Sequence, residues 1–156
     1  MSIALRFFVG TGVSSGLIAW FSAGYFSHVA AIWSPTQLLD ARNDTIAGVP
    51  PGVRVRLSDT EKAAATVDME LKATDAQVIA WRNFLAAQIG RPYDKPGILG
   101  FAFNRNWREP DSWFCSELQA AALETSGLSP KLYAPDSKIT PVALATVMSA
   151  LGARVL

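Results

Sequence analysis

The chain has 156 residues, of which 50% are hydrophobic and 17% are charged, and its 14 Lys and Arg nearly balance its 13 Asp and Glu. This length suits a single domain over residues 1–156, and the net charge of +1 gives no electrostatic reason to expect nucleic acid as a partner. One cysteine and one histidine exclude an intrachain disulfide, a cysteine-rich zinc site and a histidine-pair motif, so we expect neither a structural metal nor a cofactor.

The N-terminal third is apolar, and residues 7–39 contain no Asp, Glu, Lys or Arg. Such a run is compatible with a membrane span over residues 7–26 or with a cleaved signal. Glycines and serines interrupt it, and only Arg6 supplies a positive charge before it, so we favour a buried strand followed by a helix. We therefore expect cytoplasmic synthesis and leave delivery to the cell envelope open. Contact with lipid or membrane also stays open, although ordinary core better explains the aromatic residues Phe7, Phe8, Trp20, Phe21, Tyr25 and Phe26.

Short apolar or alternating segments predict strands at residues 4–10, 28–33, 37–42, 52–57 and 66–73. The linker SPT at 34–36 is short enough to make a hairpin of the second and third strands. In GVRVRL, at residues 52–57, the alternation predicts a half-buried strand with Arg54 and Arg56 on its exposed face.

Helical patterns cover residues 16–23, 75–89, 113–126 and 141–151. Ser14 or Ser15 is the expected cap of the first helix, Asp75 of the second and Thr140 of the last. The second helix carries an apolar stripe of Val78, Trp81, Leu85 and Ile89. Residues 90–112 form a long connection of the kind that is often functional. Strands followed by helices predict an α+β fold, with a central antiparallel sheet packed against helices.

Three residues form a candidate catalytic set. Cys115 falls in the first turn of a predicted helix, where the partial positive charge favours a thiolate. His28 is the only imidazole that could act as its base, and Asp40 lies across the predicted hairpin, where it could orient His28. Each residue alone has a commoner structural explanation: a small buried hydrophobe, a solvated or structural histidine, and a turn cap.

The order of four segments changes that weighting. YFSHVAAIW, LLDA, GRPYD and WFCSEL, together with an ITP helix start at 139–141, resemble the circularly permuted NlpC-type papain-like cysteine peptidases and amidases over about residues 5–150. The resemblance implies a papain-like fold in which Cys115 is the nucleophile, His28 the general base and Asp40 the orienting residue. Tyr93 would line the site and donate a hydrogen bond to the oxyanion, beside backbone N–H groups that include that of Cys115. Two departures are that the family often has Glu at the position of Asp40, and that the first strand lacks the Gly-Asp pair of many relatives.

What the resemblance implies for function is a cysteine-dependent hydrolase that cleaves an amide bond through an acyl-enzyme. Peptides of bacterial cell-wall peptidoglycan are the commonest substrates in that superfamily, and peptide or peptidoglycan is the partner we expect. Hydrolysis or transfer of lipid-type acyl groups on the same scaffold is an alternative, and so is a non-catalytic binding or structural protein. The sequence does not define an oligomeric state.

Two glycine-rich patterns lead to weaker hypotheses. GVSSG at residues 12–16 fits the nucleophile elbow of α/β-hydrolases, but those enzymes need a histidine late in the chain and none follows His28. GTGVSSG resembles a dinucleotide-binding loop, but its spacing is G-x-G-x-x-x-G and the strands that follow it look antiparallel.

Overall fold

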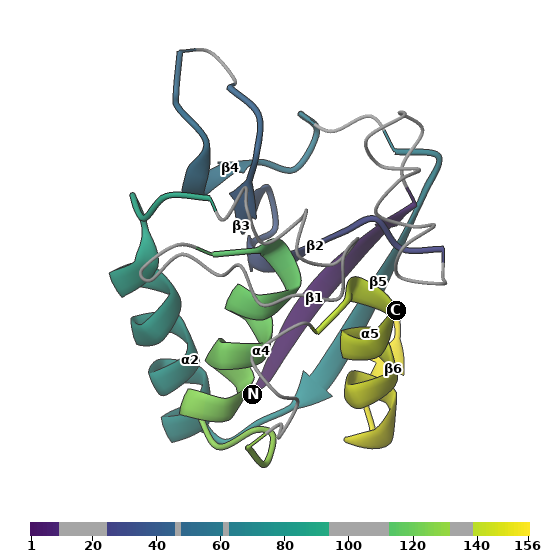
Figure 1. The fold of residues 1–156 in the computed structure, drawn as a ribbon. Helices are drawn as coiled ribbons and strands as arrows, with labels where there is room; N and C mark the ends of the chain where they lie inside the picture. Colours follow the sequence, from purple (N-terminus) through teal and green to yellow (C-terminus); the bar gives the residue numbers. More distant parts are fainter. Residues whose placement is uncertain (10–24, 46–47, 61–62, 94–112, 132–138) are drawn as a thin grey trace.

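The computed structural model describes residues 1–9, 25–45, 48–60, 63–93, 113–131 and 139–156. Within these residues the chain forms a six-stranded sheet in the order β4-β3-β2-β1-β5-β6, with antiparallel neighbours throughout (Figure 1). The strands are β1 (Ser2–Val9), β2 (His28–Ser34), β3 (Gln37–Arg42), β4 (Gly52–Leu57), β5 (Ala65–Lys72) and β6 (Arg154–Val155). In the same residues the helices are α2 (Asp75–Gln88), α4 (Cys115–Thr125) and α5 (Pro141–Ala150).

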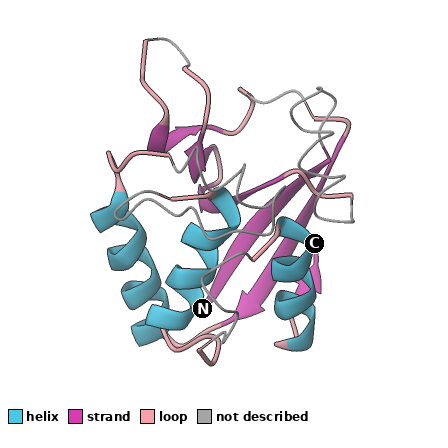
Figure 2. Cartoon of the chain, in the orientation of Figure 1, coloured by secondary structure: helices cyan, strands magenta, loops and turns pink. Residues whose placement is uncertain are grey.

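The helices pack on one side of the sheet (Figure 2). α4 contacts β2 and β3, α5 contacts β5, and α2 packs against α4. Alternate residues of a strand point to opposite faces, so Leu5 and Phe7 of β1 share the face that meets the helices. Both are fully buried and join Leu118 of α4 in the main core. The predicted α+β class, with an antiparallel sheet beside helices, is confirmed, as are the five predicted strands; β6 was not predicted.

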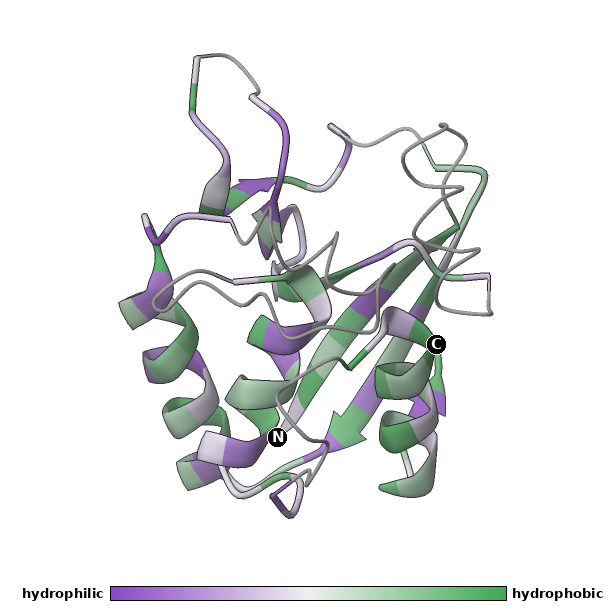
Figure 3. Ribbon diagram, viewed as in Figure 1, coloured by the Kyte–Doolittle hydropathy of each residue, from purple (hydrophilic) through white to green (hydrophobic). Residues whose placement is uncertain are grey.

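The opposite face of the sheet is more polar, and it holds a small separate cluster of Phe8, Ala30 and Leu38. The register pairs Phe8 with His28 and places Asp40 of β3 opposite Arg54 of β4. Figure 3 shows the alternation as bands of hydrophobic and hydrophilic residues along the strands. The predicted base and the predicted orienting residue therefore lie on the sheet face opposite the core shared with α4 and α5, and His28 stands at the very start of β2.

The prediction that Arg54 and Arg56 are exposed is wrong. Arg54 retains 8% of its accessible surface, and the side chain of Arg56 retains 6%. Each guanidinium is held by a carboxylate, that of Asp44 for Arg54 and that of Asp40 for Arg56. Paired charges can be buried where isolated ones cannot, and the alternation of the strand does not reveal such partners.

α5 begins where the sequence predicts, α4 begins two residues later than predicted, and the cap differs at α2. Its cap is Thr74 rather than Asp75, because the Thr74 hydroxyl accepts from the Gln77 amide at 3.2 Å while the Gln77 side chain accepts from the Thr74 amide at 3.0 Å. Ile89 lies beyond the helix and is exposed, so the stripe ends at Leu85. Thr140 caps α5 as predicted, accepting from the Ala143 amide at 3.1 Å.

Some predictions fall on residues outside the described part of the chain. They include the helix at 16–23, both glycine-rich patterns, most of the connection at 90–112 and most of the alternative span at 7–26. In the portion that the structure describes, no helix combines the length and the apolar character needed to cross a membrane.

Gly52 begins β4 at a point where another backbone segment approaches closely. The Val53 amide donates to the Arg91 carbonyl at 2.8 Å, and a Cβ at position 52 would lie 2.5 Å from that same oxygen. Because backbone and not a flexible side chain fills the space, we expect Gly52→Ala to lower the free energy of unfolding by about 2 to 3 kcal/mol. Urea denaturation measures this loss, and hydrogen exchange should show that the Val53 amide has lost protection.

Gly48→Ala is the matched control. Gly48 has a φ of +79° but no atom within 4 Å of a built Cβ, so its substitution introduces backbone strain of about 1 kcal/mol without a clash. Protection of the Val53 amide should survive in this variant. If it also survives in Gly52→Ala, the close approach does not constrain the edge of the sheet.

Candidate active site

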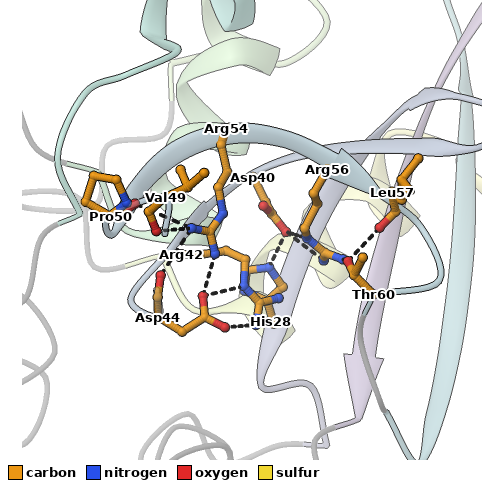
Figure 4. Close-up of polar contacts among 10 residues, drawn as sticks. All are labelled: His28, Asp40, Arg42, Asp44, Val49, Pro50, Arg54, Arg56, Leu57 and Thr60. Carbon is orange, nitrogen blue, oxygen red and sulfur yellow. Dashed lines mark hydrogen bonds and ion pairs between the residues drawn. The ribbon is translucent and has the colours of Figure 1, made fainter. Parts of the chain in front are cut away.

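The site is built first on the hairpin of β2 and β3. His28 begins β2, and the pairing of Ala31 with Leu39 places Asp40 diagonally across from it. The His28 Nε2 atom lies 2.8 Å from Asp40 Oδ2 (Figure 4). Diagonal neighbours on one face are within reach of long side chains, so a short hairpin is enough to create this contact. Asp40 is fully buried, and the His28 side chain is 14% exposed.

Cys115 reaches His28 from a different element. It is the first residue of α4, is 1% exposed, and lies close enough to His28 to affect the pKa of that imidazole. The structure thus brings together the three side chains that the sequence analysis selected, with the imidazole between the thiol and the carboxylate.

The charges of these groups depend on one another. Burial alone would lower the pKa of His28, but the charge and hydrogen bonds of Cys115 and Asp40 outweigh burial and raise the pKa to about 10. Burial alone would raise the pKa of Asp40, but His28 and Arg56 lower it to about 2. At neutral pH the imidazole therefore carries its proton.

Arg56 is a member of this cluster that the sequence analysis did not find. Its Nε and Nη2 atoms donate to Asp40 Oδ2 at 3.0 and 2.8 Å, so three nitrogen atoms converge on one carboxylate oxygen (Figure 4). Within the described residues, Asp40 Oδ1 accepts no hydrogen bond. The Phe8 ring lies near both partners of Asp40: its centroid is 5.5 Å from that of the His28 ring and 5.6 Å from the Arg56 guanidinium carbon. Only the register between β3 and β4 could have revealed Arg56. That register aligns Leu38 with Arg56, which makes Arg56 a diagonal neighbour of Asp40 on the same face.

Tyr93 lies beside the start of α4 and is 7% exposed. Its backbone forms a parallel bridge with Trp113, and its ring centroid lies 6.1 Å from that of Phe114, the residue before Cys115. The Trp113 indole in turn donates to the Gln88 side chain at 3.1 Å. These contacts place Tyr93 next to the residue that precedes Cys115, while its hydrogen bond to an oxyanion stays a prediction.

Several polar contacts fix the start of α4. Gln119, one turn after Cys115, is fully buried and donates to the Leu39 carbonyl at 3.1 Å, next to Asp40. Ser116 donates to the Ile139 carbonyl at 2.5 Å. The first N–H groups of a helix have no acceptor within the helix, so this anchored end can offer donors to a developing negative charge. In the part of the chain that the structure describes, no group of three or more His, Cys, Asp or Glu residues is arranged to hold a metal ion.

The sequence matches no family model and no curated protein. The resemblance to NlpC-type enzymes therefore still depends on the four segments and their order along the chain. The geometry of the site is an independent observation, because it follows from strand register and helix packing.

The coupled charges make stability depend on pH. The pKa of His28 is about 10 in the folded protein, against an ordinary value of 6.5, so its stabilisation is complete below pH 6.5 and is lost as pH rises through about 10. The pKa of Asp40 is lowered from 3.8 to about 2, so its contribution is present above pH 3.8 and lost as pH falls through about 2.

We therefore expect wild type to exceed His28→Gln in free energy of unfolding by the largest margin between about pH 4 and pH 6.5. The margin should shrink steadily toward pH 10, and urea denaturation at a series of pH values measures it. A margin that is constant or grows over the alkaline range would contradict the charged pairing of His28.

Proposed function

We propose that this chain is a cysteine-dependent hydrolase with a papain-like fold of the circularly permuted NlpC type. The observation that carries the proposal is the cluster of three side chains: the sole cysteine opens a helix close to the sole histidine, and the imidazole bonds a fully buried carboxylate. This arrangement has the order and roles of a thiol hydrolase triad.

The proposed reaction has two halves. In acylation, the Cys115 sulfur attacks the carbonyl carbon, the carbon–nitrogen bond breaks, and His28 gives its proton to the leaving amine. Backbone N–H groups at the start of α4, with Tyr93, hold the tetrahedral oxyanion, and each such donor contributes about 10²- to 10³-fold in rate. In deacylation, the neutral His28 takes a proton from water, the water oxygen attacks the acyl carbon, and the carbon–sulfur bond breaks to restore the thiolate and imidazolium.

Amide bonds in peptidoglycan peptides are the proposed substrate class, on the strength of the resemblance. No group in the reaction requires a metal or an organic cofactor, since nucleophile, base and oxyanion donors all come from this chain. A lipid-type ester is the alternative acyl donor, and the choice between them is an outcome of the test below.

Alkylation of Cys115 tests the thiolate directly, and labelling is unambiguous because the chain has one cysteine. We expect iodoacetamide at neutral pH to modify wild type faster than a model thiol, and His28→Gln to fall to the rate of the model thiol. Mass spectrometry measures both rates. Labelling of wild type no faster than the model thiol would favour a buried, inert cysteine.

Hydrolysis tests the reaction itself. We expect Cys115→Ala to lower turnover of peptidoglycan peptides by about 10³-fold or more, with the same loss on an acyl ester if the site also accepts lipid-type groups. Thr146→Ala is a suitable control, because that exposed hydroxyl bonds only the Val142 carbonyl within α5 among the contacts described. Persistent hydrolysis in Cys115→Ala would overturn the proposal.

A further inference from the structure

Arg56 makes its closest contacts with the carboxylate that orients the proposed base. It reaches Asp40 Oδ2 through two nitrogens, at 3.0 and 2.8 Å, and its Nη1 donates to the Thr60 hydroxyl at 3.2 Å. The Phe8 ring lies against its guanidinium and against the His28 ring. Arg56 thus reaches Asp40 from β4, while His28 reaches it from β2 on the other side of β3, and the Arg56 side chain is largely shielded from water.

The proposed reaction places an unusual demand on Asp40. Its carboxylate is fully buried. In each turnover His28 gives its proton to the leaving amine, and the imidazole beside this carboxylate is then neutral. A buried carboxylate whose only cation disappears would be strongly destabilised. Such a carboxylate would keep the proton on His28, so the reaction would stop at the step that requires a neutral imidazole.

We propose that Arg56 is a positioning residue of the site, which holds the Asp40 carboxylate toward His28 and balances its charge whenever His28 gives up its proton. This inference rests on the proposed hydrolase function. It assigns Arg56 no contact with substrate: the guanidinium acts through Asp40, and Asp40 acts through His28.

The acyl-enzyme is the state in which Arg56 matters most. Among the described residues, the charged or titratable side chains that bear on His28 are Cys115 from α4 and Asp40 from β3, with Arg56 from β4 bonded to Asp40; β1 contributes the uncharged Phe8. Once Cys115 is acylated, its sulfur carries no charge. The balance between Asp40 and Arg56 then decides whether His28 is neutral and able to accept a proton from water.

Arg54 offers a matched control on the same strand and the same face. It too is buried and ion-paired, but its Nη2 bonds Asp44 at 2.7 Å and its Nη1 bonds the carbonyls of Asp44, Val49 and Pro50. Replacing Arg54 by Met removes a buried arginine from β4 without removing any of the hydrogen bonds or ion pairs described for Asp40.

The experiment uses 4-nitrophenyl acetate as the acyl donor. Its leaving group departs without a proton, so acylation needs only the thiolate and appears as a burst, whereas steady-state turnover requires His28 to take a proton from water. We expect Arg56→Met to keep a burst of wild-type amplitude and to lose about tenfold in steady-state rate at neutral pH. The midpoint of the steady-state pH profile should rise by about one pH unit, because the proton on His28 becomes harder to remove.

A second readout does not depend on turnover. The single histidine gives a single imidazole signal in NMR, and its midpoint should also rise in Arg56→Met, within the pH range where circular dichroism reports folded protein. Arg56→Lys, which keeps the charge but not the two-nitrogen contact, should hold the midpoint near that of wild type. If Arg56→Met does not fold, Arg56→Gln removes the same charge while keeping a donor, and the same rise is expected.

The outcomes separate the two proposals. A wild-type burst, with Arg56→Met or Arg56→Gln matching Arg54→Met in burst, steady-state rate and midpoint, would overturn the role of Arg56 and leave the hydrolase intact. Absence of both a burst and rapid alkylation of Cys115 in wild type would overturn the hydrolase itself. Slow steady-state turnover and a raised midpoint only in the uncharged Arg56 variants would support the inference.

Discussion

The carboxylate of Asp40 has no exposed surface, and a charge in that setting must be balanced by neighbouring groups or lose its ionisation. His28 and Arg56 supply that balance from the strands on either side of β3, and all their contacts with Asp40 converge on Oδ2. The order of β2, β3 and β4 in the sheet is therefore an electrostatic requirement as well as a packing arrangement. A one-residue slip in either pairing would turn the partners to the other face.

The position of Cys115 depends on how α4 packs on this sheet. The helix approaches with its first residue toward His28, and the buried Gln119 bonds the carbonyl of Leu39, the residue before Asp40. Asp40 is thus held by two elements. Arg56 of the neighbouring strand bonds its carboxylate, and Gln119 of the helix bonds the carbonyl of the residue before it. Thiol, imidazole and carboxylate keep their relative positions because rigid elements, and not their own side-chain preferences, place them.

Much of this could be read from the sequence, since β2 and β3 follow their residue patterns and the linker between them is too short for anything but a hairpin. Arg56 could not be found in this way. Arginine in an alternating strand is usually solvated, and its partner Asp40 is revealed only by the register between β3 and β4. β6 has two residues, too few for a pattern. The identity of the fold beyond α+β and the chemistry of the site both depend on long-range contacts that local patterns do not encode.

The order of these groups along the chain has a consequence for newly made protein. During synthesis the strands that carry His28, Asp40 and Arg56 leave the ribosome before α4 does, and N-terminal parts generally fold first. A nascent chain can therefore pair His28 with Asp40 while it has no thiol. Cys115 meets the imidazole only when α4 docks on β2 and β3, so the thiol joins a pair of side chains that the earlier strands have already brought together.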